Sequence, residues 1–182
     1  MMLEKSTYQW YAIYTRANAE KKLFDNLLEK KIECYLPMRK VLKVWADRKK
    51  WVEEPLFKSY LFVRVSHKEF FNVLNTTGAV CYVSFGGRAQ AIPSVQIDNI
   101  KTFLAQREYE ITVSHERIQK GVSVEVLFGA FKGVHGEVVN ILGQSRILVR
   151  IDSMNCSLYA NISKEEVLLL EKKSANKVFA KG

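Results

Sequence analysis

One stretch of the sequence decides the fold: Glu54-Pro55-Leu56-Phe57-Lys58-Ser59-Tyr60-Leu61-Phe62-Val63. Its proline has no amide hydrogen to give to a strand ladder, so it ends the extended run that precedes it. Because side chains alternate across a strand, Tyr60 and Phe62 share one face, while Leu61 and Val63 share the other. A strand that is apolar on both faces is predicted to lie inside a sheet. One face can pack against helices of its own domain, whereas the second needs a cover or is kept apolar for a partner.

The composition favours a polyanionic partner. The chain has 182 residues, which is room for one domain or two small ones, and 48% of them are hydrophobic. There are 28 Lys and Arg residues against 19 Asp and Glu residues, for a net charge of +9. Such a balance indicates binding to nucleic acid or, less often, to an anionic membrane, although a basic surface without a partner has the same composition.

Several classes of protein are disfavoured by the sequence. No stretch approaches the roughly 20 apolar residues of a membrane span, and the polar N-terminus lacks the apolar core of a signal peptide. Three distant cysteines without a Cys-x-x-Cys pair, and three scattered histidines, suggest neither a disulfide framework nor a metal site. We therefore expect reduced thiols, a cytoplasmic location and no cofactor.

The first half of the chain alternates strands and helices. Residues 8–15 are predicted to form a strand, with Trp10, Ala12 and Tyr14 on one face. Asn18 can cap a helix that runs to about residue 31. The predicted apolar face of this helix consists of Phe24, Leu27, Leu28 and Ile32.

A hairpin with a tryptophan on each arm is predicted before the central strand, with its turn at residues 46–50. Its segment from Arg39 to Lys50 holds six basic residues and one acid. This patch fits a contact with nucleic acid, and it fits a solvated hairpin tip equally well.

After the central strand, we predict a helix over 67–76, a strand over 80–85 and a third helix that starts at Ser94. The third helix carries Ile97, Ile100 and Leu104 on one face. Residues 1–108 are therefore expected to form an α+β domain, a sandwich of helices on a mostly antiparallel sheet.

The pattern then changes to short strands only. Residues 109–117 have no helical stripe and are interpreted as a linker. Val122, Val124, Val126 and Phe128 alternate strictly, and four further strands follow, at 134–141, 146–151, 157–162 and 167–170. About five short strands predict a small all-β barrel over residues 118–172, followed by a basic tail at 173–182.

Four pieces of the sequence, in order, resemble the NusG family. They are Trp10-Tyr11-Ala12-Ile13-Tyr14-Thr15-Arg16 with Glu20 downstream, the central stretch, the segment from Gly78 to Pro93, and residues 121–136. The last piece resembles the KOW motif of the family's C-terminal, SH3-like barrel, and the others resemble its N-terminal NGN domain. The resemblance covers roughly residues 8–170.

Within the family, the chain is most similar to operon-specific paralogues of the RfaH and UpxY type, by its run Glu-Pro-Leu-Phe followed by Tyr-Leu-Phe-Val. It departs from the family where Lys58 and Ala130 replace a usual proline. The polar patch that RfaH offers to the polymerase gate loop has an apolar counterpart here, near residues 71–74.

The resemblance implies a non-enzymatic transcription antiterminator that binds the clamp helices of elongating RNA polymerase and promotes read-through of a long operon, such as one for polysaccharide biosynthesis. It assigns the polymerase contact to Tyr14, Phe57, Tyr60 and Phe62. By pattern alone, a place in the core is the favoured interpretation of these aromatic residues, and only the resemblance shifts it toward a contact surface. The resemblance assigns contact with the non-template DNA strand to Arg16 and Lys22. Without the resemblance, both are interpreted equally well as solvated surface cations.

The resemblance also implies that the protein is a monomer. Its barrel is expected to bind ribosomal protein S10 or Rho. Strict alternation at residues 122–128 predicts a barrel with no alternative helical form. Two other functions remain open: a housekeeping NusG-like elongation factor, and a KOW-type protein that binds RNA or the ribosome. No nucleophile with a base, phosphate loop or carboxylate pair supports an enzyme.

Overall fold

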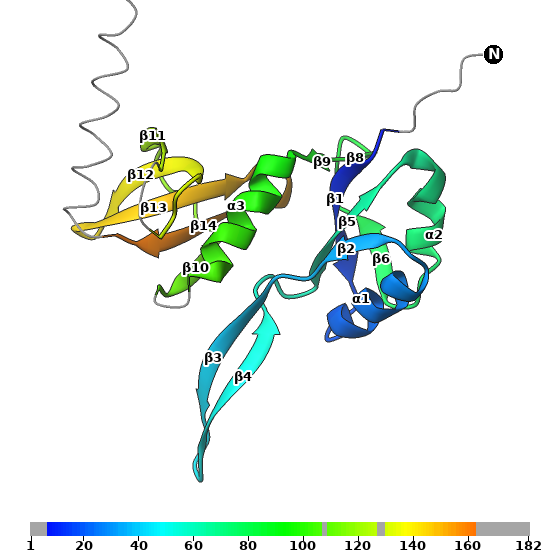
Figure 1. Ribbon diagram of the computed structural model, residues 1–182, viewed down its shortest axis with the longest axis horizontal. Helices are drawn as coiled ribbons and strands as arrows, with labels where there is room; N and C mark the ends of the chain where they lie inside the picture. The colour runs from blue at the N-terminus through cyan, green and yellow to red at the C-terminus, as the bar shows by residue number, and fades with distance from the viewer. Residues whose placement is uncertain (1–6, 107–108, 127–129, 163–182) are drawn as a thin grey trace, which may run out of the picture. The chain divides into compact units, whose positions relative to one another are not determined.

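The computed structural model describes residues 7–106, 109–126 and 130–162. The chain divides into two compact units, Met1–Ser94 and Val95–Gly182. It is a mixed α/β protein with antiparallel sheets and few helices, as the sequence predicts at that level (Figure 1).

The first unit contains most of the helix and strand elements. In chain order they are β1 (Gln9–Thr15), α1 (Glu20–Glu29), β2 (Glu33–Tyr35), β3 (Met38–Val44), β4 (Lys49–Pro55), β5 (Tyr60–Val65), the 3-10 helix η1 (His67–Glu69), α2 (Phe70–Leu74), β6 (Ala79–Tyr82), β7 (Ser84–Phe85), β8 (Arg88–Ala89) and β9 (Ala91–Ile92).

The main sheet of this unit has the strand order β2-β5-β1-β6, and β9 also pairs with β1. Every pairing in it is antiparallel. Because β5 lies between β2 and β1, the prediction that residues 60–63 form an interior strand is confirmed. Two further strand pairs, β3–β4 and β7–β8, form hairpins of their own. The first confirms the hairpin expected before the central strand.

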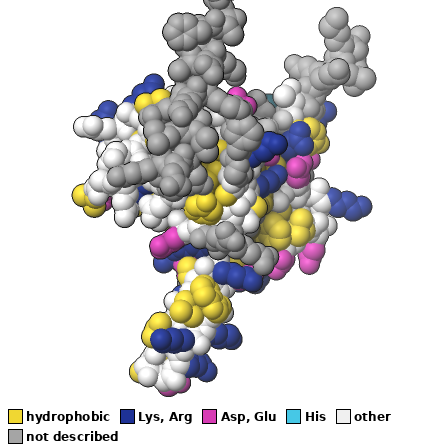
Figure 2. Space-filling view, turned by 60° about the vertical axis from the view of Figure 1, so that its left-hand side comes forward, with side chains coloured by type: hydrophobic (Ala, Val, Ile, Leu, Met, Phe, Trp, Pro, Cys, Tyr) yellow, Lys and Arg dark blue, Asp and Glu magenta, His cyan; other side chains and the backbone are white. Residues whose placement is uncertain are grey.

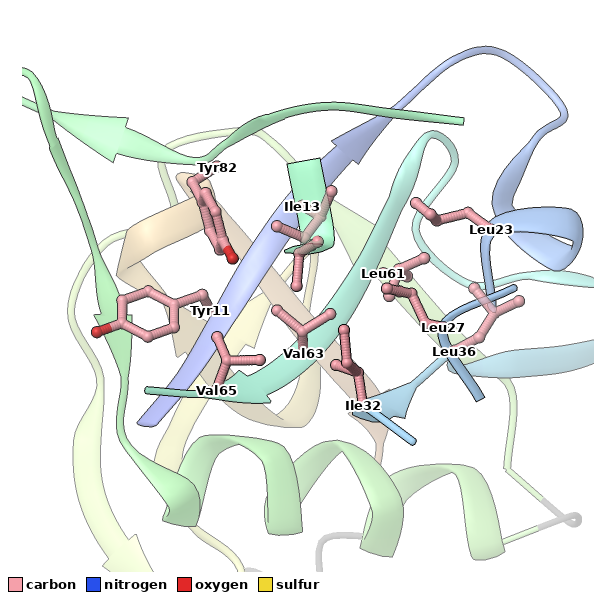
Figure 3. Close-up of a cluster of buried hydrophobic side chains, with 11 residues drawn as sticks. Tyr11, Ile13, Leu23, Leu27, Ile32, Leu36, Leu61, Val63, Val65 and Tyr82 are labelled. Carbon is pink, nitrogen blue, oxygen red and sulfur yellow. The ribbon is translucent and has the colours of Figure 1, made fainter. Parts of the chain in front are cut away.

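One face of the sheet packs against the unit's own helices, as expected. Figure 3 shows Leu61, Val63 and Val65 of β5 beside Tyr11 and Ile13 of β1. Helix α1 adds its buried side chains to this cluster, and Val73 joins it from α2. Removing these side chains from water stabilises the unit by roughly 25 cal/mol per Å² of apolar surface.

The predicted apolar face of α1 is confirmed for Leu27 and Ile32, which are buried, and for Phe24, which packs against the core cluster, but it is wrong at Leu28. The fully buried side chains of α1 are Leu23 and Leu27, while Leu28 is half exposed. The proposed cap is also wrong, because Asn18 has φ of 58° and the helix starts after Ala19 without a side-chain cap. Asparagine tolerates the left-handed conformation, so Asn18 turns the chain toward the sheet. That turn sets which helical face meets the core.

The 3-10 helix η1, which leads directly into α2, begins with a capping box that the sequence prediction missed. The carboxylate of Glu69 accepts hydrogen bonds from the backbone N–H (2.9 Å) and hydroxyl (3.1 Å) of Ser66. Such reciprocal bonds satisfy amide groups that have no partner within the helix. Helix α2 ends at Leu74, two residues before the predicted end at residue 76. Gly78 lets the chain approach α1, since a Cβ there would lie 3.3 Å from Cβ of Leu23.

The second unit consists of α3 (Ser94–Ala105, whose first residue closes the first unit) and five strands. The strands are β10 (Ile111–Ser114), β11 (Val122–Glu125), β12 (His135–Ile141), β13 (Gln144–Ile151) and β14 (Cys156–Asn161), with a 3-10 helix, η2 (Asp152–Met154), before the last. They form one antiparallel sheet in the order β10-β14-β13-β12-β11.

Two predictions from the sequence, the linker and the place of the third helix, are corrected in this unit. The linker at 109–117 is wrong for residues 111–114, which form β10 and pair with β14. Helix α3, which we expected to complete the first domain, belongs mainly to the second unit. The side chain of Asn99 donates to the carbonyl of His135 at 2.9 Å and accepts from its N–H at 3.3 Å. The boundary at residue 108 remains a prediction.

Of the predicted barrel, the structure shows an antiparallel sheet of five strands. In the described part of the chain, no ladder joins β10 to β11, so closure into a KOW barrel remains a prediction. Phe128, the strand predicted at 167–170 and the tail at 173–182 lie outside the described residues. Within the sheet, Arg150 donates to the carboxylate of Glu137 at 2.7 Å and to the carbonyls of Ile118 and Gln119 at 3.1 Å.

Candidate functional site

The second face of the first sheet carries the aromatic residues that the sequence singled out. In the register of β1 with β5, Tyr14 lies opposite Tyr60 and Ala12 lies opposite Phe62. Trp10 continues the same face toward the start of β1. The predicted sharing of this face by Tyr60 and Phe62 is therefore confirmed, and the strand pairing adds Tyr14 beside them.

Burial changes along this face. Phe62 is completely buried and Trp10 is 6% exposed, whereas Tyr14, at the other end, is 41% exposed. Tyr60 is of intermediate exposure. The rings of Tyr14 and Tyr60 meet edge to face, with 5.3 Å between their centroids. This exposed tyrosine pair is the part of the face that a partner can reach.

Phe57 lies below this pair, in the turn between β4 and β5. Its ring packs edge to face on Phe62, with centroids 5.8 Å apart, and only 4% of its surface is exposed. The predicted contact set thus separates into two layers. Tyr14 and Tyr60 pack on each other toward the exposed end of the face. Phe57 and Phe62 pack on each other where it is buried, which is what the core interpretation expects for the second pair.

A buried carboxylate fixes the turn. Ser59 has φ of 62°, and its N–H donates to Glu20 Oε1 at 2.7 Å. The carbonyl of Ser59 accepts from the N–H of Thr15 at 2.8 Å, which ties the turn to the end of β1. Glu20 is only 6% exposed, so this carboxylate is buried although it lies in the first turn of an amphipathic helix. The only sequence signal for its role was its position in the first turn of a helix after a strand.

The two predicted nucleic-acid contacts flank the same end of the sheet. Arg16 follows β1 directly, and its N–H donates to the carbonyl of Gly78 at 3.0 Å. Lys22 lies in the first turn of α1, and both side chains are exposed. Neither forms an ion pair with any other residue that the structure describes. Both are therefore available to phosphate or base groups.

The described residues offer no arrangement for bond chemistry at this site. Among them, no group of three His, Cys, Asp or Glu side chains could hold a metal ion. Burial raises the pKa of the Cys34 thiol to about 11 and that of Cys156 to about 12, so neither is a thiolate near neutral pH. Within the same residues, no helix is long and apolar enough to cross a membrane.

Sequence comparison finds relatives over most of the chain. The "Transcription termination/antitermination protein NusG" of Streptococcus pyogenes serotype M1 is 28% identical over 153 residues, which covers 77% of this chain and 84% of the relative. The protein of the same name from Lactococcus lactis is 29% identical over 154 residues, covering 76% of this chain and 81% of the relative. The match spans both units.

A solved structure has a similar fold. Thermotoga maritima NusG superposes with a TM-score of 0.52 at 20% identity, covering 88% of this chain and 96% of that one. The family model for NusG, described as a transcription termination factor, matches residues 8–104, which include the β1–β5 register and the aromatic face. The chain therefore belongs to the NusG family, whose members are transcription factors and not enzymes.

Proposed function

We propose that this NusG family protein is an operon-specific antiterminator that binds elongating RNA polymerase and promotes read-through of a long operon, such as one for polysaccharide biosynthesis. The observation that carries the proposal is the exposed Tyr14–Tyr60 pair above a packed aromatic layer. Rigid aromatic side chains held by a firm support are typical anchors of protein interfaces. A helical partner such as the polymerase clamp helices would rest on this end of the sheet.

Phe57 and Phe62 act beneath the contact. We infer that their edge-to-face packing and near-complete burial make this part of the face rigid, so that binding at the neighbouring Tyr14–Tyr60 end costs little side-chain entropy. Glu20 holds the turn that carries Phe57 against α1. The four aromatic residues therefore contribute to one surface, two by touching the partner and two by positioning.

Substitution of Tyr14 tests the polymerase contact. We expect Tyr14→Ala to weaken binding to RNA polymerase by about tenfold, as for a central interface residue. Tyr8 is the matched control, because it is also an exposed tyrosine, 50% against 41%, just before β1. Tyr8→Ala should bind like the unsubstituted protein. Equal losses for both variants would reject the proposed surface.

Reading of the non-template strand is assigned to Arg16 and Lys22. The planar guanidinium of Arg16 can stack on or hydrogen-bond an exposed base, and the Lys22 ammonium can neutralise a phosphate. Arg16→Ala should weaken binding to a specific paused complex more than binding to bare polymerase. An equal loss on both would exclude a role in reading DNA.

A housekeeping elongation factor is the second candidate, favoured by relatives that carry the general NusG name. In vitro transcription with the cognate polymerase separates the two. Read-through only on a template with the protein's own operon leader supports the specialised antiterminator, while equal effects on an unrelated leader support the general factor. No effect on either leader would favour an RNA-binding or ribosome-binding protein.

We propose that the β-sheet of the second unit belongs to a stable KOW-type barrel that recruits a further partner, ribosomal protein S10 or Rho. Its antiparallel sheet and the bonds of Arg150 to Glu137 and to the chain before β11 support a single fold. Amide chemical shifts of residues 120–165 in the free protein should be those of strands. Helical shifts there would contradict the proposal.

A further inference from the structure

The β3–β4 hairpin has a different distribution of charge at its base and its tip. At the base, Glu54 pairs with Arg39 at 2.9 Å and Glu53 lies 3.9 Å from Lys40. Glu54 also pairs, at 3.2 Å, with Lys43, which lies one residue before the end of β3. Three of the six cations predicted as a basic patch are therefore neutralised by carboxylates of the opposite arm.

The other three cations gather at the tip. Arg48, Lys49 and Lys50 form no ion pair with any part of the chain that the structure describes, and Asp47 is the one acid among them. Lys50 also lies directly opposite Lys43 in the ladder. Like charges in that position destabilise a strand pair. Positive charge is thus concentrated where the hairpin gains no stability from it.

The tip also exposes aromatic surface. Trp51 is 65% exposed and lies opposite Leu42, which is 46% exposed, with Val44 further along the same face. Trp45 differs, because the guanidinium of Arg48 lies over its ring, 5.8 Å from the centroid. Figure 2 shows the hairpin at the bottom of the view, with hydrophobic side chains interleaved with Lys and Arg. One indole is therefore covered by a cation and the other is open.

We propose that the tip of the β3–β4 hairpin is a binding site for single-stranded nucleic acid, separate from Arg16 and Lys22. Trp51 supplies a stacking surface for an unpaired base, and Lys49, on the same face of β4, contacts an adjoining phosphate. Arg48 in the turn and Lys50 on the other face of β4 add positive charge for further phosphates of the nucleic acid. Alternating cations and open aromatic rings are the chemistry that binds single strands without sequence preference. Single-stranded DNA and single-stranded RNA both present the phosphates and unpaired bases that such a site binds.

Single strands fit the tip better than the alternatives do. A duplex presents phosphates to the cations, but its bases are stacked on one another and leave the Trp51 ring uncovered. An acidic protein would likewise use only the charges. The combination of open ring and unpaired cations is therefore the feature that selects the ligand.

Fluorescence anisotropy with the full-length chain tests the site without polymerase. The probes are labelled oligo(dT) and oligo(U) of about 15 nucleotides, within the usual site size for single strands. Trp51→Ala should weaken binding by about tenfold, and Trp51→Phe by less, because a smaller ring still stacks. Comparison of the two probes shows whether DNA or RNA is preferred. A duplex of the same length should bind more weakly than either.

A charge-matched pair of variants tests the cations. The tip variant replaces Arg48, Lys49 and Lys50 by Ala, and the base variant replaces Arg39, Lys40 and Lys43 by Ala. Both lose three positive charges, so any effect of net charge alone would be equal. The tip variant should lower the slope of log affinity against log salt by about 2, at roughly 0.7 per phosphate contact, and the base variant by less.

Intrinsic fluorescence gives an independent readout. The chain has three tryptophans, and Trp10 is buried. Oligonucleotide should quench the emission, and Trp51→Phe should remove most of that quenching. Equal losses in the tip and base variants, unchanged affinity of Trp51→Ala, or equal binding to duplex or to polyglutamate would each overturn the proposal.

Discussion

The β1–β5 and β3–β4 strand pairs are both antiparallel ribbons rich in aromatic and branched residues, yet they differ in burial. Ile13, Leu61 and Phe62 in the first pair are completely buried. In the second pair, Val44 and Trp51 are 64% and 65% exposed. The difference follows from neighbours: β1 and β5 are paired further by β2, β6 and β9, whereas β3 and β4 pair only with each other.

This contrast shows where aromatic residues stabilise the fold and where they reach solvent. On the aromatic face of β1–β5, exposure increases toward one end, where Tyr14 is 41% exposed and Tyr60 is of intermediate exposure. In β3–β4 they are available along the hairpin, and little of the unit's stability depends on them. The four predictions below test this division in order of decreasing effect.

The largest effect is expected at Phe62. Phe62→Ala should lower the free energy of unfolding by about 3–5 kcal/mol, because it leaves a cavity beneath Phe57 and Tyr60. Trp51→Ala, a larger truncation on the exposed hairpin, should cost less than about 0.5 kcal/mol. Urea denaturation monitored by circular dichroism measures both. Similar losses would mean that the two ribbons contribute alike.

The next effect concerns the turn that links the aromatic layer to α1. Glu20→Ala removes the acceptor of the Ser59 N–H and should cost about 1.5–3 kcal/mol. It should also weaken polymerase binding, since the turn carries Phe57. Glu29→Ala, an exposed substitution in the same helix, is the control and should change neither quantity. If Glu20→Ala left binding intact, the turn would have no positioning role.

A pH dependence is expected in the second unit. Hydrogen bonds from the Arg150 side chain, together with one from the Gly121 N–H, lower the pKa of Glu137 below its ordinary value of 4.5 despite burial. Because the folded pKa is the lower one, this stabilisation is fully present above about pH 4.5 and is lost as the pH falls through the folded value. Glu137→Gln should cost about 1–3 kcal/mol at pH 7 and flatten the acid dependence.

Amide exchange at Ile147 and Leu148 would report this change in the second unit alone. Glu54, whose pKa Arg39 also lowers, provides the comparison in the exposed hairpin. Glu54→Gln should leave the exchange of those two amides unchanged. A change there would mean that the carboxylates act through the whole chain.

The smallest effect is expected for the salt bridges at the hairpin base. Arg39→Ala should cost less than about 1 kcal/mol, because a partly exposed ion pair gains little over its hydrated state. Exchange of the Val41 and Lys43 amides should accelerate slightly, with no change in β5. A loss as large as that of Phe62→Ala would show that the hairpin is part of the core.

The sequence predicted element type better than element position. The strand at 60–65 and the hairpin before it followed from alternation, a proline and a polar turn, which are local signals. In α1 the predicted apolar face included the half-exposed Leu28 and missed the buried Leu23. Asn18 was wrong as the cap, since it has φ of 58° and the helix starts after Ala19. Strand β10 was missed because its four residues form a strand through pairing with β14, and not through a pattern visible in the local sequence.

The candidate site was predicted in part. The sequence identified its aromatic residues, and the strand register brought Tyr14 and Tyr60 together. It did not separate the outward layer from the buried one, because alternation assigns a face and not an exposure. Glu20 was not recognised as a positioning residue, since its partner is a backbone N–H 39 positions away.

The sequence by itself determined the family, the order of most strands and helices, and the two faces of the central strand. These depend on side-chain periodicity and turn residues, which act over a few positions. Only the tertiary structure decided which aromatic residues reach solvent and which cations are neutralised. Exposure and ion pairing depend on neighbours far apart in the chain, as Glu54 with Arg39 and Tyr14 with Tyr60 demonstrate.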